Sequence, residues 1–166
     1  MVHSYFRIII SPKSCGWSLF SKAAFLLLII GLLTACSDTP IDRRLNFNTT
    51  VYLNQLPLQV AVFRSREEQR QGLMHVNHLP ENAGGLFVFA AETDVNFWMK
   101  HVEIELDLLF FDQQGQLSHR VEAAQPCHTL ICPRFKARNI KYVLEVNAGF
   151  FKTNKLPEST YLRFSE

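Results

Sequence analysis

Alternation of apolar and polar side chains along most of the chain predicts a protein made mainly of β-strands. The alternation has a period of two residues, which places one face of a strand in the core. It is clearest in four segments, residues 50–56, 58–63, 103–112 and 140–146. Shorter apolar or aromatic runs indicate further strands at residues 86–89, 95–100, 117–123 and 161–164. The turn signal at residues 113–116 predicts that residues 104–123 form a hairpin.

Helix signals are few and short. Ser65 and Glu68 have the spacing of a capping box, in which each side chain bonds a backbone N–H of the other residue. They predict a helix over residues 66–74, interrupted by Gly72, and a second short helix is expected over residues 149–154. Together these elements predict a β-sandwich or a half-barrel of about seven strands with one or two short helices.

An apolar run near the N-terminus predicts export. Residues 23–35 are apolar and follow Lys22, but a run of 13 residues is shorter than the roughly 20 that span a membrane. The run ends in Leu33-Thr34-Ala35-Cys36, which resembles the lipobox of bacterial lipoproteins. We therefore expect a signal peptide at 1–35, a lipidated Cys36 with a tether at 36–48, and one β-rich domain at 49–166.

The residue after Cys36 bears on where the lipidated protein would lie. In Gram-negative lipoproteins an aspartate at that place tends to retain the protein in the inner membrane, and here the residue is Ser37. This resemblance implies a protein anchored to the outer membrane and facing the periplasm. The membrane, contacted through the lipid anchor, is the first expected partner.

Composition excludes two classes of protein. The chain has 166 residues, 48% of them hydrophobic and 19% charged, which is enough apolar material for a core and rules out a disordered protein. Lys and Arg number 17 against 15 Asp and Glu. Without residues 1–35, which hold three basic residues and no acidic one, 14 basic residues face 15 acidic ones. A near-neutral domain is not expected to bind nucleic acid.

Two cysteines remain after the signal peptide and Cys36 are set aside. Cys127 and Cys132 enclose four residues, and disulfides persist in an exported protein. A redox-active pair or a metal clamp is an alternative. The spacing differs from the Cys-x-x-Cys of thioredoxin-like sites, so a structural bridge is favoured.

Five residues are candidates for ligand binding. Trp98 and Lys100 share one face of the predicted strand, where the ring can stack on a ligand and the ammonium can bind an anion. A carboxylate at Asp107 interrupts an apolar strand and needs a partner, which the side chain of Arg70 or Lys100 could supply. With Glu145 these residues would form a polar cleft, and the alternative is an ion pair that only stabilises the fold.

Six ordered blocks between about residues 65 and 150 resemble the "domain of unknown function 192" family. The blocks are Glu68 to Met74, Leu79-Pro80-Glu81-Asn82, Gly85 to Phe89, Phe97-Trp98-Met99-Lys100, Ile104 to Asp107, and Pro126-Cys127 to Cys132-Pro133. The resemblance implies a compact, β-rich single domain that is often exported. It implies no known reaction.

The chain departs from that family pattern at five positions. Val76 stands where the family often has arginine, and Gly85 where it usually has methionine. His101-Val102 replaces Asn-Thr, and Glu105 replaces proline. A ligand role that depends on that arginine or on the Asn-Thr pair does not carry over to this chain.

Three functions fit the sequence, and a non-catalytic binding or accessory module is favoured over an enzyme because no nucleophile or metal signature occurs. Its partner would be a small molecule, a glycan or an envelope protein, and no cofactor is expected. One alternative is a hydrolase of envelope glycans that uses two of the carboxylates Glu103, Glu105, Asp107 and Glu145. The other is a periplasmic copper-handling protein, which needs Met74, Met99, His75 or His101 to converge.

Overall fold

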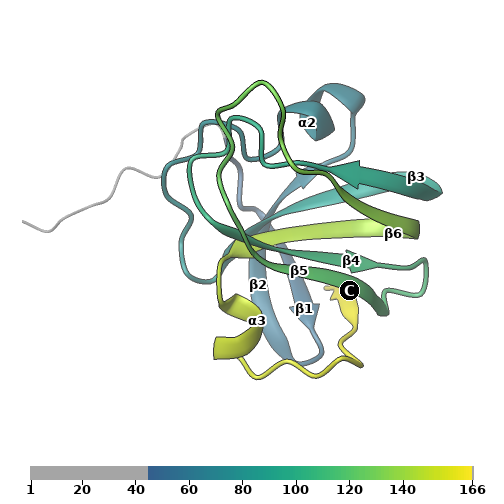
Figure 1. Ribbon diagram of the computed structural model, residues 1–166. Coiled ribbons are helices and arrows are strands. Elements are labelled where there is room, and N and C mark those ends of the chain that lie inside the picture. The colour runs from purple at the N-terminus through teal and green to yellow at the C-terminus, as the bar shows by residue number, and fades with distance from the viewer. Residues whose placement is uncertain (1–44, 166) are drawn as a thin grey trace, which may run out of the picture. The chain divides into compact units, whose positions relative to one another are not determined.

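The computed structural model describes residues 45–165 and confirms the mainly β prediction (Figure 1). The strands of this part of the chain are β1 (Thr49–Leu53), β2 (Leu56–Phe63), β3 (Ala83–Phe97), β4 (Leu106–Phe111), β5 (Leu117–Ala124), β6 (Phe135–Asn147) and β7 (Leu162–Phe164). The helices are α2 (Arg66–Gln71) and α3 (Phe150–Thr153), and neither is long and apolar enough to cross a membrane. The predicted signal peptide and Cys36 lie outside the described residues.

The seven strands form one curled sheet in the order β5-β4-β6-β3-β2-β1-β7. β2 and β3 run parallel, with α2 on the connection between them, and the other neighbouring strands are antiparallel. Two backbone bonds join the chain at the start of β7 to the chain at the start of β5, around an antiparallel bridge between Gln116 and Tyr161. The N–H of Leu117 donates to Thr160 at 2.8 Å, and the N–H of Leu162 donates to Gly115 at 2.7 Å. The sheet is therefore a half-barrel, one of the two predicted architectures.

Both faces of the sheet are covered by apolar side chains. α2 and α3 lie on opposite sides of it (Figure 1). On the α3 side, Phe150 and Phe151 pack on a layer that includes Leu109 and Leu144. On the α2 side, the segment after the helix contributes Leu73 and Val76 to a second layer. All six residues of β4 are buried as a result. Any polar side chain on β4 is therefore inside the core rather than in contact with water.

Several predicted elements have different bounds, among them β6, which was expected over residues 140–146 and runs from Phe135 to Asn147, and three other differences concern the candidate residues or helix α2. Residues 86–89 and 95–100 were expected as two strands, but β3 runs without interruption over 15 residues. It pairs with β6 along this length through two register shifts, between Val88 and Thr93 and between Thr93 and Val95, and such bulges bend and twist a strand. β4 begins only at Leu106, so Glu103 and Glu105 precede the strand and do not share a face of it with Asp107.

The third difference concerns helix α2. The predicted capping box is present, since the Ser65 hydroxyl accepts the N–H of Glu68 and the Glu68 carboxylate accepts the N–H of Ser65 at 2.8 Å. The helix ends at Gln71 rather than at residue 74. Gly72 follows with a φ of +45°, and a Cβ there would lie 2.7 Å from the ring of Phe87. A glycine at this turn lets the chain leave the helix close to β3.

Asp107 is fully buried and holds three parts of the fold together. Its Oδ1 accepts the N–H of Ala123 on β5 at 2.9 Å and that of Gly149 at 3.1 Å. Its Oδ2 accepts the N–H of Phe151, in the first turn of α3, at 3.1 Å. Since no side chain of α3 caps the helix itself, the carboxylate of β4 takes this role. The sequence argument expected Arg70 or Lys100 as the partner of Asp107, and its partners are instead backbone N–H groups.

Asp107→Asn is expected to lower the free energy of unfolding by about 2–3 kcal/mol, because an amide offers one acceptor oxygen to three backbone donors. Urea unfolding followed by circular dichroism measures this change. Glu105→Gln removes an exposed carboxylate two residues away and should cost less than about 0.5 kcal/mol. Equal losses in the two variants would contradict the structural role of Asp107.

Candidate functional site

Two adjoining pockets lie between α2 and the segment that follows β3. The outer pocket has a volume of about 460 Å³ and is lined by Glu67, Arg70, Gln71, Met74, His75, Trp98, Lys100 and His101. The inner pocket is much smaller, at about 30 Å³. It shares Arg70, Gln71, Met74, Trp98 and Lys100 with the outer one and continues to the core residues Leu73, Phe87, Val102 and Glu145. The structure thus brings four of the five candidate residues together.

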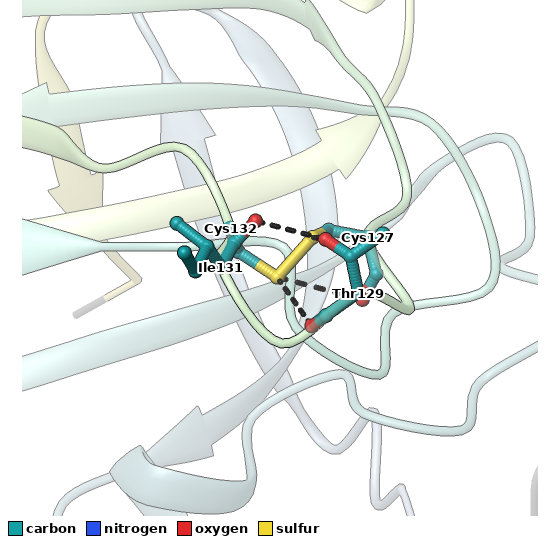
Figure 2. The surroundings of a disulfide bond; sticks show 4 residues. All are labelled: Cys127, Thr129, Ile131 and Cys132. Carbon is teal, nitrogen blue, oxygen red and sulfur yellow. Dashed lines mark hydrogen bonds between the residues drawn. A yellow bond between two sulfur atoms is a disulfide. The ribbon is translucent and has the colours of Figure 1, made fainter.

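The disulfide loop fixes the wall that carries Trp98 and Lys100. Cys127 and Cys132 are joined by a disulfide, as predicted, and the Thr129 hydroxyl donates to the carbonyl of Ile131 within the loop that it closes (Figure 2). Cys127 forms a parallel bridge with Lys100. Its N–H donates to Met99 at 3.1 Å, and its carbonyl accepts the N–H of His101 at 3.0 Å. The loop therefore acts as a short extra strand for residues 99–101.

Trp98 stands at the mouth of the site with two cations beside its ring. The guanidinium carbon of Arg134 lies 3.7 Å from the ring centroid, and the Nζ atom of Lys100 lies 5.4 Å from it. The face of an aromatic ring attracts cations, so these contacts hold both charges at the mouth. Sequence reasoning missed Arg134. The path of the chain after the disulfide loop brings Arg134 close to Trp98, and no pattern in the local sequence indicates this contact.

Glu145 is the most unusual polar group of the site. It is 3% exposed, and its Oε2 has no hydrogen-bond partner within the described residues 45–165. Gly85 and Leu108 are its neighbours on the adjacent strands and carry no polar side-chain atom. Burial raises the pKa of this carboxyl to about 8, because the charged form would lose its hydration without a compensating partner. The carboxyl is therefore mostly protonated at neutral pH.

A surface cluster of histidines borders the outer pocket. The rings of His75 and His101 stack at 5.5 Å, and the N–H of His75 donates to the carbonyl of His101 at 2.7 Å. The Glu103 carboxylate lies 3.7 Å from His75 and 3.5 Å from His128. The φ of His101 is +58°, a region that asparagine and histidine tolerate better than most residues.

Asp107 is the candidate residue that does not join the site. In the pairing of β4 with β6, Asp107 lies opposite Val146 and Leu108 lies opposite Glu145. Side chains alternate across a strand, so the two carboxyl groups lie on opposite faces of the sheet. The glycosidase hypothesis allowed Asp107 and Glu145 as one of its possible carboxylate pairs, and these two side chains do not share a cleft.

The residues considered for copper are split between the site and the core. Met74, His75 and His101 line the outer pocket, whereas Met99 is buried in the α2-side layer. Within residues 45–165, no group of three or more histidine, cysteine, aspartate or glutamate side chains is placed to hold a metal ion. A copper site here would therefore depend on the thioether of Met74 and the two imidazoles.

A family model matches residues 49–164, and the chain belongs to that family, DUF192, described as an uncharacterized ACR. The resemblance inferred from the six sequence blocks is thereby confirmed. No sequence among the curated proteins matches the chain.

Two solved structures share the fold. One is that of a candidate transcription regulator from Sinorhizobium meliloti 1021, which has 28% sequence identity and a TM-score of 0.63, and the match covers 70% of this chain and 91% of that one. The other is that of a protein of unknown function from Novosphingobium aromaticivorans DSM 12444, with 22% identity and a TM-score of 0.62, over 69% and 82% of the two chains.

Glu145→Gln is expected to reduce the decline of stability with rising pH. The pKa of Glu145 is about 8 in the folded chain against an ordinary 4.5. Between these pH values the folded state keeps a proton that the unfolded state has released, so the free energy of unfolding falls as pH rises. The slope from this group is at most about 1 kcal/mol per pH unit. Urea unfolding from pH 4.5 to 8.5 should show a flatter dependence of the free energy of unfolding on pH for Glu145→Gln than for the wild type.

The exposed control Glu81→Gln should keep the wild-type slope. An unchanged slope in Glu145→Gln would contradict the raised pKa of Glu145.

Replacing both Cys127 and Cys132 by alanine is expected to cost about 2 kcal/mol of stability, the entropy of closing so short a loop. It should also change the fluorescence of Trp98, the only tryptophan after Cys36, because the loop holds residues 99–101 and Arg134 follows it by two residues. Urea unfolding and emission spectra of the folded variant measure the two effects. A destabilised variant with a wild-type spectrum would show that the disulfide does not shape the site.

Proposed function

We propose that this protein is a non-catalytic binding module that holds a small ligand in the outer and inner pockets. The observation that carries the proposal is the buried carboxyl of Glu145, whose Oε2 has no partner among residues 45–165, at a pocket that Trp98 and Lys100 also line. A buried polar group without a partner costs about 1–3 kcal/mol. A ligand that supplies the missing hydrogen bond recovers that free energy, so an unpartnered group at a pocket favours binding.

The position of the charged groups favours binding over hydrolysis. A glycosidase needs two carboxyl groups about 5–9.5 Å apart on either side of the bond that is broken. Glu67 is the other carboxylate that lines these pockets, and it lies 2.9 Å from Arg70 in an ion pair. Asp107 lies on the other face of the sheet. Glu145 is therefore better suited to hold a ligand than to share a reaction with a second acid.

The cellular setting belongs to the same proposal. The apolar run at 23–35 and the lipobox-like end at Cys36 support a lipoprotein, and Ser37 supports anchoring at the outer membrane with the domain in the periplasm. The Cys127–Cys132 disulfide suits an oxidising compartment. In this setting the module would present its pocket to solutes or envelope components of the periplasm.

Copper handling remains the second candidate, because Met74, His75 and His101 line the same pocket. Thioether and imidazole groups are ligands that copper accepts. Met99 does not join them, so this site would have three side-chain ligands at most.

A thermal-shift screen of the unlipidated chain from residue 37 tests the proposal. The compounds are metals including copper, peptidoglycan fragments, sugars, nucleotides and amino acids. A ligand at 100 times its Kd stabilises the folded state by about 2.7 kcal/mol, which raises the melting temperature by several degrees. Trp98→Ala and Lys100→Gln should remove the shift, whereas Lys136→Gln, an exposed lysine outside both pockets, should retain it.

Other outcomes of the screen have defined meanings. A copper shift that Met74→Leu abolishes would favour the second candidate. If no compound raises the melting temperature, or if the shifts survive in Trp98→Ala, the pocket is not the binding site.

A further inference from the structure

The inner pocket admits only a small chemical group. Its volume of about 30 Å³ is close to the share of one molecule in liquid water. Apolar side chains, among them Leu73, Phe87 and Val102, form much of its wall, and the carboxyl of Glu145 is its buried polar group. On the strand beside Glu145, Gly85 leaves room that Phe63 and Leu73 fill. Glu145 therefore lines the pocket, and its buried Oε2 lacks a hydrogen-bond partner among residues 45–165.

A primary ammonium group fits these surroundings. It is small, and it supplies both an N–H donor for the unpartnered Oε2 and a charge opposite to that of the carboxylate. The rings of Phe87, Phe97 and Trp98 also line the pocket, and aromatic rings attract cations. A bound Ca²⁺ or Mg²⁺ would need several oxygen ligands, and among residues 45–165 Glu145 is the only carboxylate that lines the inner pocket.

The cations that line the two pockets restrict the ligand further. Lys100 and Arg70 line both pockets and would repel a ligand whose only charge is positive. Arg70 is paired with Glu67 at 2.9 Å, whereas no ion pair within residues 45–165 includes Lys100. An anionic group on the outer part of the ligand would form the ion pair that Lys100 lacks. The outer pocket, at about 460 Å³, has the volume of small-molecule sites.

We propose that the ligand is a small zwitterion whose primary ammonium group pairs with Glu145 in the inner pocket and whose anionic group lies beside Lys100 in the outer pocket. An amino acid or a short peptide with its amino end inward has this chemistry. The inference rests on the proposed function, since it names the ligand class of the same site.

Binding would change the protonation of the site. The carboxyl of Glu145 is mostly protonated at pH 7, whereas an alkyl ammonium group remains charged up to about pH 10 and the α-amino group of a peptide up to about pH 8. Formation of the ion pair ionises the carboxyl, and its proton passes to the solvent. The charged groups that line the pocket around Glu145 are Arg70 on α2 and Lys100 after β3, and its strand neighbours Gly85 and Leu108 are uncharged. Affinity should therefore rise about tenfold per pH unit from pH 6 and level off near pH 8.

Titration calorimetry, with Trp98 fluorescence as a second readout, tests this ligand class on the chain from residue 37. The probes are glycine, β-alanine and γ-aminobutyrate, which place the two charges at increasing distances. Their N-trimethyl analogues have the same charges but no N–H donor and a head too large for the inner pocket. We expect at least one primary amine to bind, its trimethyl analogue to bind at least tenfold more weakly, and nearly one proton to be released per ligand at pH 7.

Variants locate the two contacts. Glu145→Gln keeps the shape of the side chain without its charge, and both it and Lys100→Gln should weaken binding at least tenfold. Lys136→Gln should bind as the wild type does. Circular dichroism and urea unfolding confirm that each variant folds, so a loss of binding can be assigned to the missing group.

Three results would overturn the zwitterion proposal. They are equal binding of the trimethyl analogues, unchanged affinity in Glu145→Gln, and no binding of any primary amine. If a neutral or purely anionic compound from the screen still binds in a manner that depends on Trp98, the pocket remains the binding site and only the ligand class is wrong. If no compound binds there, both proposals fall.

Discussion

The central strands β4 and β6 have apolar layers on both faces, and most of the structure follows from this constraint. α3 closes one face, and the segment after α2 closes the other (Figure 1). A polar side chain on these strands is cut off from water and must be satisfied inside the protein. Asp107 and Glu145 are two such side chains, and their surroundings differ. Three backbone N–H groups satisfy Asp107, whereas Oε2 of Glu145 is left without a partner beside a pocket.

This difference separates scaffold from site. The bonds of Asp107 cap α3 and hold β5 against β4, so its carboxylate stabilises the fold. Glu145 contributes no comparable bond through Oε2, and its burial raises its pKa to about 8. Burying a carboxyl without a hydrogen-bond partner lowers the stability of the fold. An unsatisfied buried group of this kind therefore needs an explanation, and a role in ligand binding supplies one. The disulfide loop belongs to the same arrangement, because Cys127 aligns residues 99–101 and brings Arg134 to Trp98.

Local signals predicted the elements that depend on local chemistry. The capping box at Ser65 predicted where α2 begins, and the alternation of residues 103–112 predicted the hairpin of β4 and β5. The division of β3 into two strands was wrong, because the bulges between Val88 and Val95 disturb the period while β6 keeps the strand paired. The end of α2 was also misplaced, since the close approach of Gly72 to Phe87 involves residues far apart in the sequence.

The sequence by itself determined the family, the β-rich class and the disulfide pair, because these depend on residue types, their order and their short-range spacing. It also identified Arg70, Trp98, Lys100 and Glu145 as polar groups of interest. Only the tertiary structure decided that Asp107 does not belong with them. That outcome depends on which residue of β4 pairs with Glu145, and a shift of one residue in the register would exchange the two faces. The packing of the disulfide loop against residues 99–101 likewise joins segments about 30 residues apart, and spacing along the chain carries no record of it.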